Sequence, residues 1–229
     1  MTNLGTGGSA YNAQLVNSAS ISTSTGSYAV GTGAATFSAA TSDYIQINSP
    51  SLSFGTNGMS FVKVGSTADK SRAFDFGNNP PGGTGKENTL VLFLSNTPWP
   101  VSFITSNAEV YLTNAWGANL DDNTWKHLVW TIDASGNWLF YLNGGLVSSY
   151  PGSGYPNNVA RQYNYLGHSG WTGDSYFTGE IAEFYLFTYV ITAAQARALY
   201  NQHSPAPSPA PTPAPTVVRL YGIDVCIHF

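Results

Sequence analysis

Short apolar alternations, each closed by a cluster of turn residues, constrain the fold of this chain more than any other feature. Segments such as 44–47, 125–133 and 180–187 place apolar residues close to every second position, and Gly, Asn, Ser or Pro clusters separate successive segments. A period of two is typical of β-strands, because successive side chains point to opposite faces of a sheet. We predict thirteen short strands and therefore an all-β sandwich.

The composition limits what the surface of such a sandwich can bind. Only 9% of the 229 residues are charged, Lys and Arg together number 8, and the formal net charge is -4. A nucleic-acid-binding face needs clustered cations to neutralise phosphates, so this composition excludes nucleic acid as a partner. An aromatic content of 14% with so little charge is the reverse of a disordered chain. The exterior must therefore consist mostly of uncharged polar residues and glycine.

Cysteine usage and hydropathy narrow the setting in which the chain acts. Cys226 is the single cysteine, which excludes an intramolecular disulfide and a cysteine-based metal site. No apolar run reaches the roughly 18 residues of a membrane span. Residues 1–8 lack the basic and apolar regions of a signal peptide. We expect an extracellular or virion-surface location, with the chain exported by another route, released in a particle, or forming a fragment of a longer protein.

The C-terminal part of the chain contains three successive sequence patterns: a helix, a proline-rich segment and a strand. Thr192 and Gln195 form a capping-box pattern that predicts one short helix, which ends where the prolines begin. Residues 204–216, SPAPSPAPTPAPT, predict a polyproline II linker with a reach of about 40 Å. Residues 217–229 alternate like a single strand, too short to fold alone, which adds to the sheet edge of another chain or begins a second domain. We therefore predict a domain at 1–203, a linker at 204–216 and a strand-like tail at 217–229.

Two stretches carry the motifs of one known family. WKHLVWTID at 125–133 precedes WLFYLNG at 138–144, and YLG at 165–167 precedes FTGEIAEF at 177–184. In this order and spacing they resemble the laminin G-like jelly rolls of the concanavalin A-like lectin/glucanase superfamily. The resemblance implies an all-β, two-sheet antiparallel jelly-roll sandwich with an open concave face, followed here by the short helix, the linker and a terminal strand. It also implies binding of sugars, proteins or lipids more often than catalysis.

Catalysis on this fold needs a pair of carboxylates that the sequence does not offer in the required pattern. Glucanases of the superfamily place two carboxylates an even number of residues apart on one strand, about 5 Å from each other for retaining hydrolysis. The only close Glu pair, Glu180 and Glu183, has an odd spacing, so a regular strand sends the two side chains to opposite faces. His127 lies inside the family motif and is interpreted as a structural strand residue. We predict that the chain is not an enzyme.

Calcium is the metal for which the sequence offers candidate ligands. It takes about six to eight oxygen ligands, often from loops rich in Asp, Asn and Glu. KENTLVLF at 86–93 is similar to a pentraxin strand whose acidic residue and Asn bind calcium, and the loop at 168–176 lies where pentraxins place further ligands. The alternative is a set of ordinary solvated loop residues. The candidate calcium ligands are Glu87, Asn88 and Asp174.

Aromatic residues in polar loops predict the ligand-binding site. Sugar rings stack their C–H faces on exposed aromatic rings, while Asn, Asp and Gln hydrogen-bond the hydroxyls. The segment SGWTGDSY at 169–176 has this composition, and NAWGAN at 114–119 is the second choice. For each aromatic residue the alternative role is to anchor its loop. The candidate ligand contacts are Trp171, Asp174, Tyr176, Trp116 and Asn119.

These observations leave three functions of different classes. The first is a non-catalytic recognition module that binds glycan or protein ligands on an exterior surface. The second is a structural protein, because a jelly roll followed by Pro-Ala-Pro repeats resembles, in composition, surface proteins of large algal viruses. Such a capsid-associated or spike protein would dock residues 204–229 on neighbouring chains of an assembly. The third, a glycoside hydrolase, is disfavoured by the carboxylate pattern.

Overall fold

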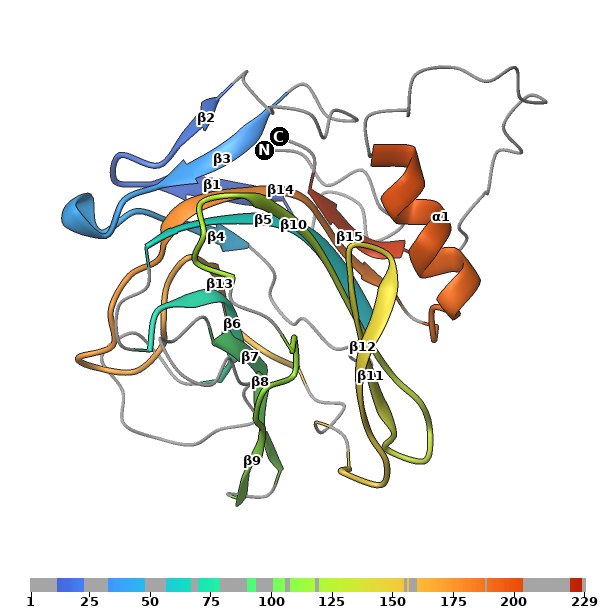
Figure 1. The fold of residues 1–229 in the computed structure, drawn as a ribbon. Helices are drawn as coiled ribbons and strands as arrows, with labels where there is room; N and C mark the ends of the chain where they lie inside the picture. The colour runs from blue at the N-terminus through green and yellow to red at the C-terminus, as the bar shows by residue number, and fades with distance from the viewer. Residues whose placement is uncertain are drawn as a thin grey trace, which may run out of the picture.

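Two antiparallel sheets face each other across a shared core, and one helix lies against the outer face of one sheet (Figure 1). This architecture confirms the predicted two-sheet sandwich with a short C-terminal helix. The computed structural model describes residues 12–22, 33–47, 57–66, 70–78, 90–93, 101–105, 108–117, 120–154, 156, 160–187, 189–203 and 223–227.

The first sheet brings together strands from most of the chain. It contains seven strands, and β13 lies between β4 and β6 although it follows them by about a hundred residues. In spatial order they are β1 (Ala13–Val16), β4 (Tyr44–Ile47), β13 (Tyr163–Leu166), β6 (Arg72–Gly77), β7 (Leu90–Phe93), β8 (Val101–Thr105) and β9 (Ala108–Leu112).

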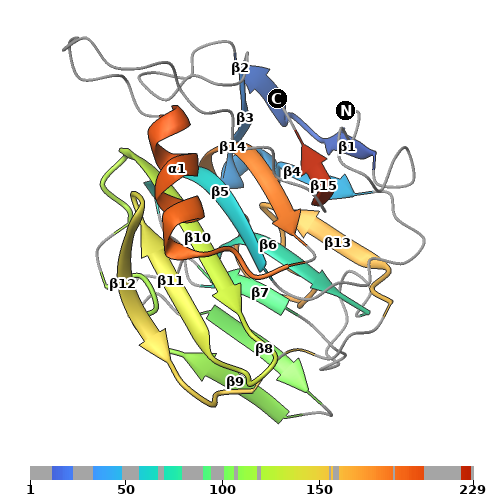
Figure 2. The ribbon, with the colours of Figure 1, turned by 90° about the vertical axis from the view of Figure 1, so that its right-hand side faces the viewer.

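The second sheet contains eight strands and carries the helix (Figure 2). Strand β15 (Ile223–Ile227) pairs with β14 outside the main path. The path itself runs through β12 (Gly145–Tyr150), β11 (Trp138–Leu142), β10 (Trp125–Ile132), β5 (Asn57–Ser66), β14 (Thr178–Phe187), β3 (Ala34–Phe37) and β2 (Ser20–Ser22). The short strand β2 was not among the predicted strands.

The core between the sheets follows the predicted alternation. Along β10, the side chains of Leu128, Trp130 and Ile132 point into the shared core, whereas Val129 belongs to a second apolar cluster. The Trp130 ring stacks on Phe74 of the opposite sheet, with ring centroids 5.1 Å apart. Aromatic packing across the two sheets therefore holds the sandwich together.

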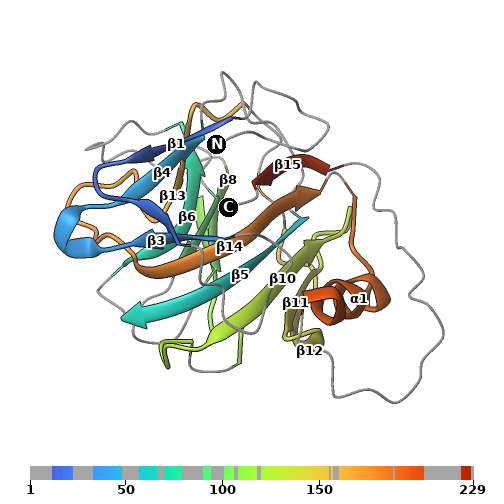
Figure 3. The same ribbon diagram turned by 90° about the horizontal axis from the view of Figure 1, so that it is seen from above.

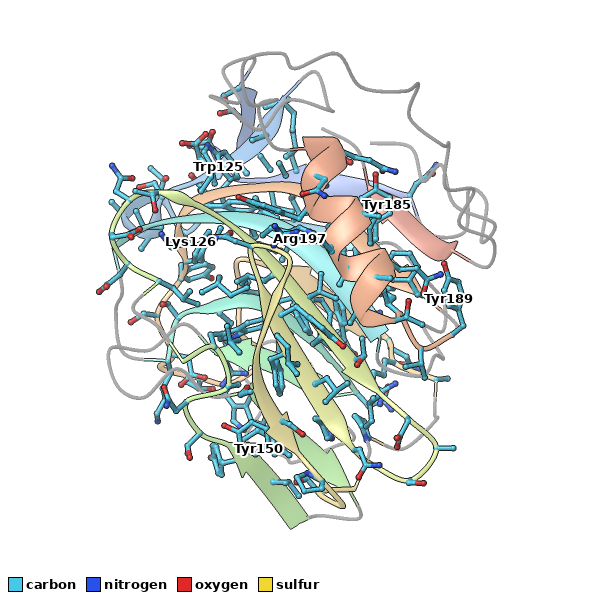
Figure 4. All side chains as sticks on the ribbon, turned by 45° about the vertical axis from the view of Figure 1, so that its right-hand side comes forward. Trp125, Lys126, Tyr150, Tyr185, Tyr189 and Arg197 are labelled. Carbon is cyan, nitrogen blue, oxygen red and sulfur yellow. The ribbon has the colours of Figure 1, made fainter. Side chains whose placement is uncertain are left out.

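The second apolar cluster explains why strands of the eight-stranded sheet are buried on both faces. Helix α1 (Ala193–His203) places Ala196 and Leu199 against Val129, and Tyr185 and Tyr189 pack at the side of the same cluster (Figure 4). The outer face of the sheet is thus a second, smaller core. Strands covered on both faces bury nearly continuous runs of residues, as β10 does.

The helix begins with the predicted capping box. The Thr192 backbone N–H donates to Oε1 of Gln195 at 2.8 Å, and the Gln195 N–H donates to Oγ1 of Thr192 at 3.3 Å. Two backbone donors at the start of α1 are thereby satisfied by the two side chains. His127, on β10 beneath the helix, is fully buried with its ring 5.8 Å from that of Tyr200. Its position agrees with the structural role expected from the sequence.

The strand β14 departs from regular alternation. Glu183 has a φ of 53°, and the pairing with β5 shifts register between Ala182 and Tyr185. An irregularity of this kind adds a residue to one strand, so side chains beyond it change face. The expectation that Glu180 and Glu183 point to opposite faces assumed an unbroken strand, which β14 is not. The Glu183 carboxylate is buried and accepts a hydrogen bond from the Tyr185 hydroxyl.

The tail forms a strand on its own chain. In β15, Val225 lies opposite Leu186 and Ile227 lies opposite Phe184, antiparallel to β14 (Figure 3). The predicted strand at the C-terminus is therefore present, and in this structure it completes the sheet of the domain rather than that of a neighbouring chain. The predicted linker at 204–216 lies outside the described residues.

Candidate ligand-binding site

The outer face of the seven-stranded sheet carries a polar and aromatic row. Leu166 of β13 and Phe74 of β6 point into the core, so their neighbours Tyr165 and Asp75 point to the outer face. Tyr165 lies directly opposite Asp75 on β6 and opposite Gln46 on β4. The sheet thus presents side chains from three strands side by side.

The loop that follows β13 closes over this row. The Gly167 N–H donates to the Ala73 carbonyl at 2.9 Å, and the Phe177 N–H donates to the Gly167 carbonyl at 3.1 Å, so the two ends of the loop meet. Gly167 has a φ of 81°, and a Cβ there would lie 2.8 Å from the Phe37 ring. This corner therefore requires glycine. The loop includes the predicted segment 169–176.

A buried ionic cluster joins the loop to the sheet. The Arg72 guanidinium bridges two carboxylates, with one nitrogen on Asp75 and another on Asp174. All three side chains are at most 5% exposed. The Gly170 N–H donates to Asp75 at 2.9 Å, and the Ser169 hydroxyl donates to Asp174 at 2.8 Å. Arg72 therefore fixes the loop on the sheet by charge-assisted hydrogen bonds.

The charges of this cluster depend on one another. Burial raises the pKa of Asp75 above its usual range, whereas the charge of Arg72 and the hydrogen bond from Gly170 act in the opposite direction. Lys70, whose side chain is largely exposed, brings its Nζ to 3.9 Å from Asp174. The buried Asp75 side chain is therefore stabilised by its cationic partner Arg72 and by the Gly170 N–H.

The cluster also positions Trp171. The Trp171 backbone N–H donates to the Ser169 hydroxyl at 2.9 Å, and the Arg72 guanidinium lies 4.3 Å from the centre of the indole ring. The tryptophan is only partly buried. A guanidinium over an aromatic ring is a favourable cation–π arrangement. Trp171 is therefore held in place and still reaches the surface.

Four more rings pack beside the ionic cluster. The His168 ring stacks on that of Tyr176, with centroids 4.6 Å apart and planes 6° apart, and lies 4.8 Å from Tyr44 and 4.9 Å from Tyr165. Tyr165 is buried, whereas His168, Tyr44 and Tyr176 are only half-buried. Tyr44, His168 and Tyr176 therefore add partly exposed rings to the region that also carries Trp171.

His168 makes the stability of this site dependent on pH. Burial, with a contribution from Arg72, lowers its pKa from 6.5 to about 4. Between these values the unfolded chain binds a proton that the folded chain does not, so the free energy of unfolding falls as the pH drops from about 6.5 to about 4. We expect His168 to contribute a loss of about 1.5 kcal/mol, roughly half of the full linkage value because the ring is partly solvated.

His168→Phe is the matched variant, because it keeps an aromatic ring and removes the titrating group. Denaturant unfolding of both proteins between pH 7 and pH 4 isolates the histidine, since the carboxylates titrate in both. The wild type should lose more stability than the variant across this window. Parallel curves would show that His168 has an ordinary pKa.

The structure brings together the predicted ligand contacts of segment 169–176 and places Trp116 of segment 114–119 elsewhere. Trp171, Asp174 and Tyr176 all lie on the loop over the seven-stranded sheet. Trp116 instead lies in the shared core, fully buried and 5.0 Å from the Phe140 ring. A buried ring offers no face to a ligand, so its expected role as a contact is corrected to one in packing. Asn119 lies outside the described residues.

The calcium prediction finds no match in the described residues. They contain no group of three or more His, Cys, Asp or Glu side chains arranged to hold a metal ion. Asp174, the candidate ligand among them, already accepts hydrogen bonds from Arg72 and Ser169. Calcium would have to compete with these partners for the Asp174 carboxylate, so its role as a ligand stays a prediction. Glu87 and Asn88 lie outside the described residues, so that part stays a prediction.

Sequence reasoning missed the residues that the sheet contributes. Arg72 and Asp75 belong to β6, and Tyr44 and Tyr165 belong to β4 and β13. The segment RAFDF at 72–76 did hold a signal, because two opposite charges within an otherwise apolar strand must be paired when the strand is buried. The loop partner of these charges, Asp174, is about a hundred residues away.

The comparison with protein families decides the classification. A model of the concanavalin A-like lectin/glucanases superfamily matches residues 39–197, which is well over half of the chain. The chain belongs to this superfamily. The superfamily match runs from before β4 to the first five residues of α1 and includes the loop over the seven-stranded sheet. A comparison with curated protein sequences returns no significant match.

Solved structures of this superfamily's fold include binding domains. Domain 4 of AbnA, a GH43 extracellular arabinanase from Geobacillus stearothermophilus, solved in complex with arabinotriose, has a TM-score of 0.61 at 18% identity, covering 82% of this chain and 87% of that one. The binding domain of botulinum neurotoxin DC, in complex with rat synaptotagmin II, has a TM-score of 0.57 at 13% identity, covering 86% and 48%. The binding domain of botulinum neurotoxin serotype G has a TM-score of 0.56 at 16% identity, covering 83% and 46%.

These likenesses establish the fold of this superfamily member. The chain spans about half the length of the neurotoxin binding domains. None of these findings supports a capsid-associated or spike protein. Within the described residues, no helix has the length and hydropathy needed to span a lipid bilayer.

Proposed function

We propose that this protein is a non-catalytic recognition module that binds glycans at the loop over the seven-stranded sheet. The observation that carries the proposal is the position of Trp171, which is partly exposed and held against a guanidinium that two carboxylates fix. An aromatic ring ordered before binding loses little conformational freedom when a sugar stacks on it. Tyr44 and Tyr176, both half-buried, extend the same surface.

The ionic cluster supports recognition over hydrolysis. Glycoside hydrolysis needs one carboxylic acid and one carboxylate free to act on the glycosidic bond. In this site, Asp75 and Asp174 are buried and share Arg72 as their partner. Glu180 and Glu183 belong to β14, in the other sheet. The carboxylates described at this site therefore serve to order the loop.

The structural neighbours support a ligand on an exterior surface. The AbnA domain belongs to an extracellular enzyme and was solved with arabinotriose, whereas the neurotoxin DC domain was solved with a protein, rat synaptotagmin II. We favour a glycan because partly exposed aromatic rings beside fixed polar groups suit sugar C–H faces and hydroxyls. These neighbours do not identify the sugar that this chain binds or whether binding needs calcium. The experiment below therefore examines both.

Trp171→Ala is the direct test of this site. A glycan array that includes arabino-oligosaccharides, read with calcium and with chelator, identifies a ligand for the wild-type chain. Removing the stacking surface should then lower the affinity for that glycan about tenfold, because aromatic stacking contributes about 1 kcal/mol beyond the apolar area that it buries. Isothermal titration of wild type and variant measures the change.

Tyr111→Ala provides the matched control. Tyr111 is an exposed aromatic residue on β9, at the far edge of the same sheet from the loop. Its removal should leave the glycan affinity unchanged. An equal loss in both variants, or no loss in Trp171→Ala, would contradict the assignment of the site. Binding of proteins alone on a parallel protein array would contradict a glycan as the ligand.

A further inference from the structure

We propose that β15 is an exchangeable strand, and that two copies of this chain associate by each placing residues 223–227 on the β14 edge of the other. This inference concerns self-association and is independent of the proposed glycan site. Three observations support it: an edge that β15 covers among the described strands, the distance between the end of α1 and that edge, and the composition of the connecting segment.

The first observation is the edge of β14. Its first half, Gly179 to Ile181, pairs with β3, whereas its second half, Phe184 to Phe187, pairs with β15 on the same side. The other side of β14 is occupied by β5. Among the described strands, β15 is thus the one that pairs with this side of β14 at 184–187. Without β15, these backbone groups would form an unpaired sheet edge.

The part of β14 that pairs with β15 carries residues of both apolar clusters. Phe184 and Leu186 are buried in the shared core, and Phe187 is buried in the cluster under α1. Tyr185, whose ring stacks on that of Phe187 with centroids 6.1 Å apart, lies at the border of the same cluster (Figure 4). An uncovered edge here would lie beside residues of both apolar clusters, and a strand from the same chain or from another can cover it.

The second observation is where α1 ends. Ala196 packs in the cluster that includes Phe187 of β14, but Tyr200, one turn later, lies against Gly144 in the turn between β11 and β12. From β11 to β15 the sheet order passes β10, β5 and β14, which makes four inter-strand spacings. At about 4.8 Å each, the chain must return across about 19 Å.

The third observation is the connecting sequence. The Pro-Ala-Pro composition of 204–216 predicts a stiff polyproline II spacer with a reach of about 40 Å, twice the distance that return requires. A stiff spacer that is longer than the gap lowers the effective concentration of the strand at its own edge. The same reach allows the strand to lie on a second copy. Exchange preserves every β14–β15 hydrogen bond, and two reciprocal exchanges close a twofold dimer.

A single cysteine substitution distinguishes β15 paired with its own chain from β15 paired with a second copy. Tyr185 lies directly opposite Cys226, which is the one cysteine of the chain. Opposed residues of antiparallel strands have Cα atoms within about 5.5 Å, a distance that a disulfide can bridge. Tyr185→Cys in the full chain, refolded at several protein concentrations and oxidised, forms an intrachain disulfide if the strand stays on its own chain. Exchange forms a covalent dimer.

We expect a covalent dimer on non-reducing gels whose share rises with the protein concentration during refolding. The wild type, with Cys226 alone, and Tyr185→Cys combined with Cys226→Ser report random cross-linking and should remain mostly monomeric. Replacing 204–216 by Gly and Ser of equal length should lower the dimer share several-fold. The flexible segment then has an r.m.s. length of about 20 Å, close to the gap.

Light scattering on the unmodified chain keeps the test independent of the substitution. The wild type should be a dimer at high concentration, and deletion of 217–229 should make it monomeric. Cross-linked monomer at every concentration would overturn the proposal. So would a wild type that stays monomeric throughout, or a deletion variant that still forms dimers.

Discussion

Arg72→Met should lower the free energy of unfolding by about 3–5 kcal/mol. The substitution keeps an unbranched side chain of similar length and removes the charge that bridges Asp75 and Asp174. Asp75 would then be buried without a cation, and Asp174 would keep only the exposed Lys70 nearby. Burial already raises the pKa of Asp75. Denaturant unfolding at pH 7 measures the loss, which should shrink at acidic pH as Asp75, whose pKa burial raises, becomes protonated.

The triple variant Arg72→Met, Asp75→Asn, Asp174→Asn is the control. It removes the two negative charges together with the positive one, and replacing a whole buried ion cluster is often neutral for stability. We expect it to recover most of the lost stability. If the triple variant is as unstable as Arg72→Met, the packing of Arg72 rather than its charge orders the loop.

Trp116→Ala should also destabilise the protein by about 3–5 kcal/mol, without changing the affinity of the folded protein for its glycan. The side chain is fully buried in the shared core and packs edge-on against Phe140. Its removal leaves a cavity that the surrounding strands cannot fill. Unfolding measurements combined with titration at a temperature where the variant is folded test both halves of this expectation.

Trp171→Ala gives the opposite pattern and serves as the comparison. A partly exposed ring on a loop contributes little to the core, so its removal should change stability by less than about 1 kcal/mol while the glycan affinity falls about tenfold. Trp116→Phe, which keeps an aromatic ring in the cavity, should cost much less than alanine. Loss of binding by folded Trp116→Ala would restore the second-choice segment at 114–119 as part of a site.

Local chemistry made the fold predictable. Alternation along 125–132 and 138–142 predicted strands whose inward residues form the core, and Thr192 and Gln195 predicted the start of α1. These signals depend on residues within a few positions of one another. The aromatic and polar composition of the loop at 169–176 marked it as the candidate site, and its role in binding stays a prediction.

Tertiary structure decided everything that depends on distant partners. The sequence by itself determined an all-β sandwich, the helix and the loop that carries Trp171, because periodicity, capping and loop composition are local. Only the fold could place Arg72 and Asp75 beneath that loop, move Trp116 into the core, and return Ile223–Ile227 to β14. The physical reason is that burial and charge pairing arise between strands that are adjacent in space but far apart in the chain.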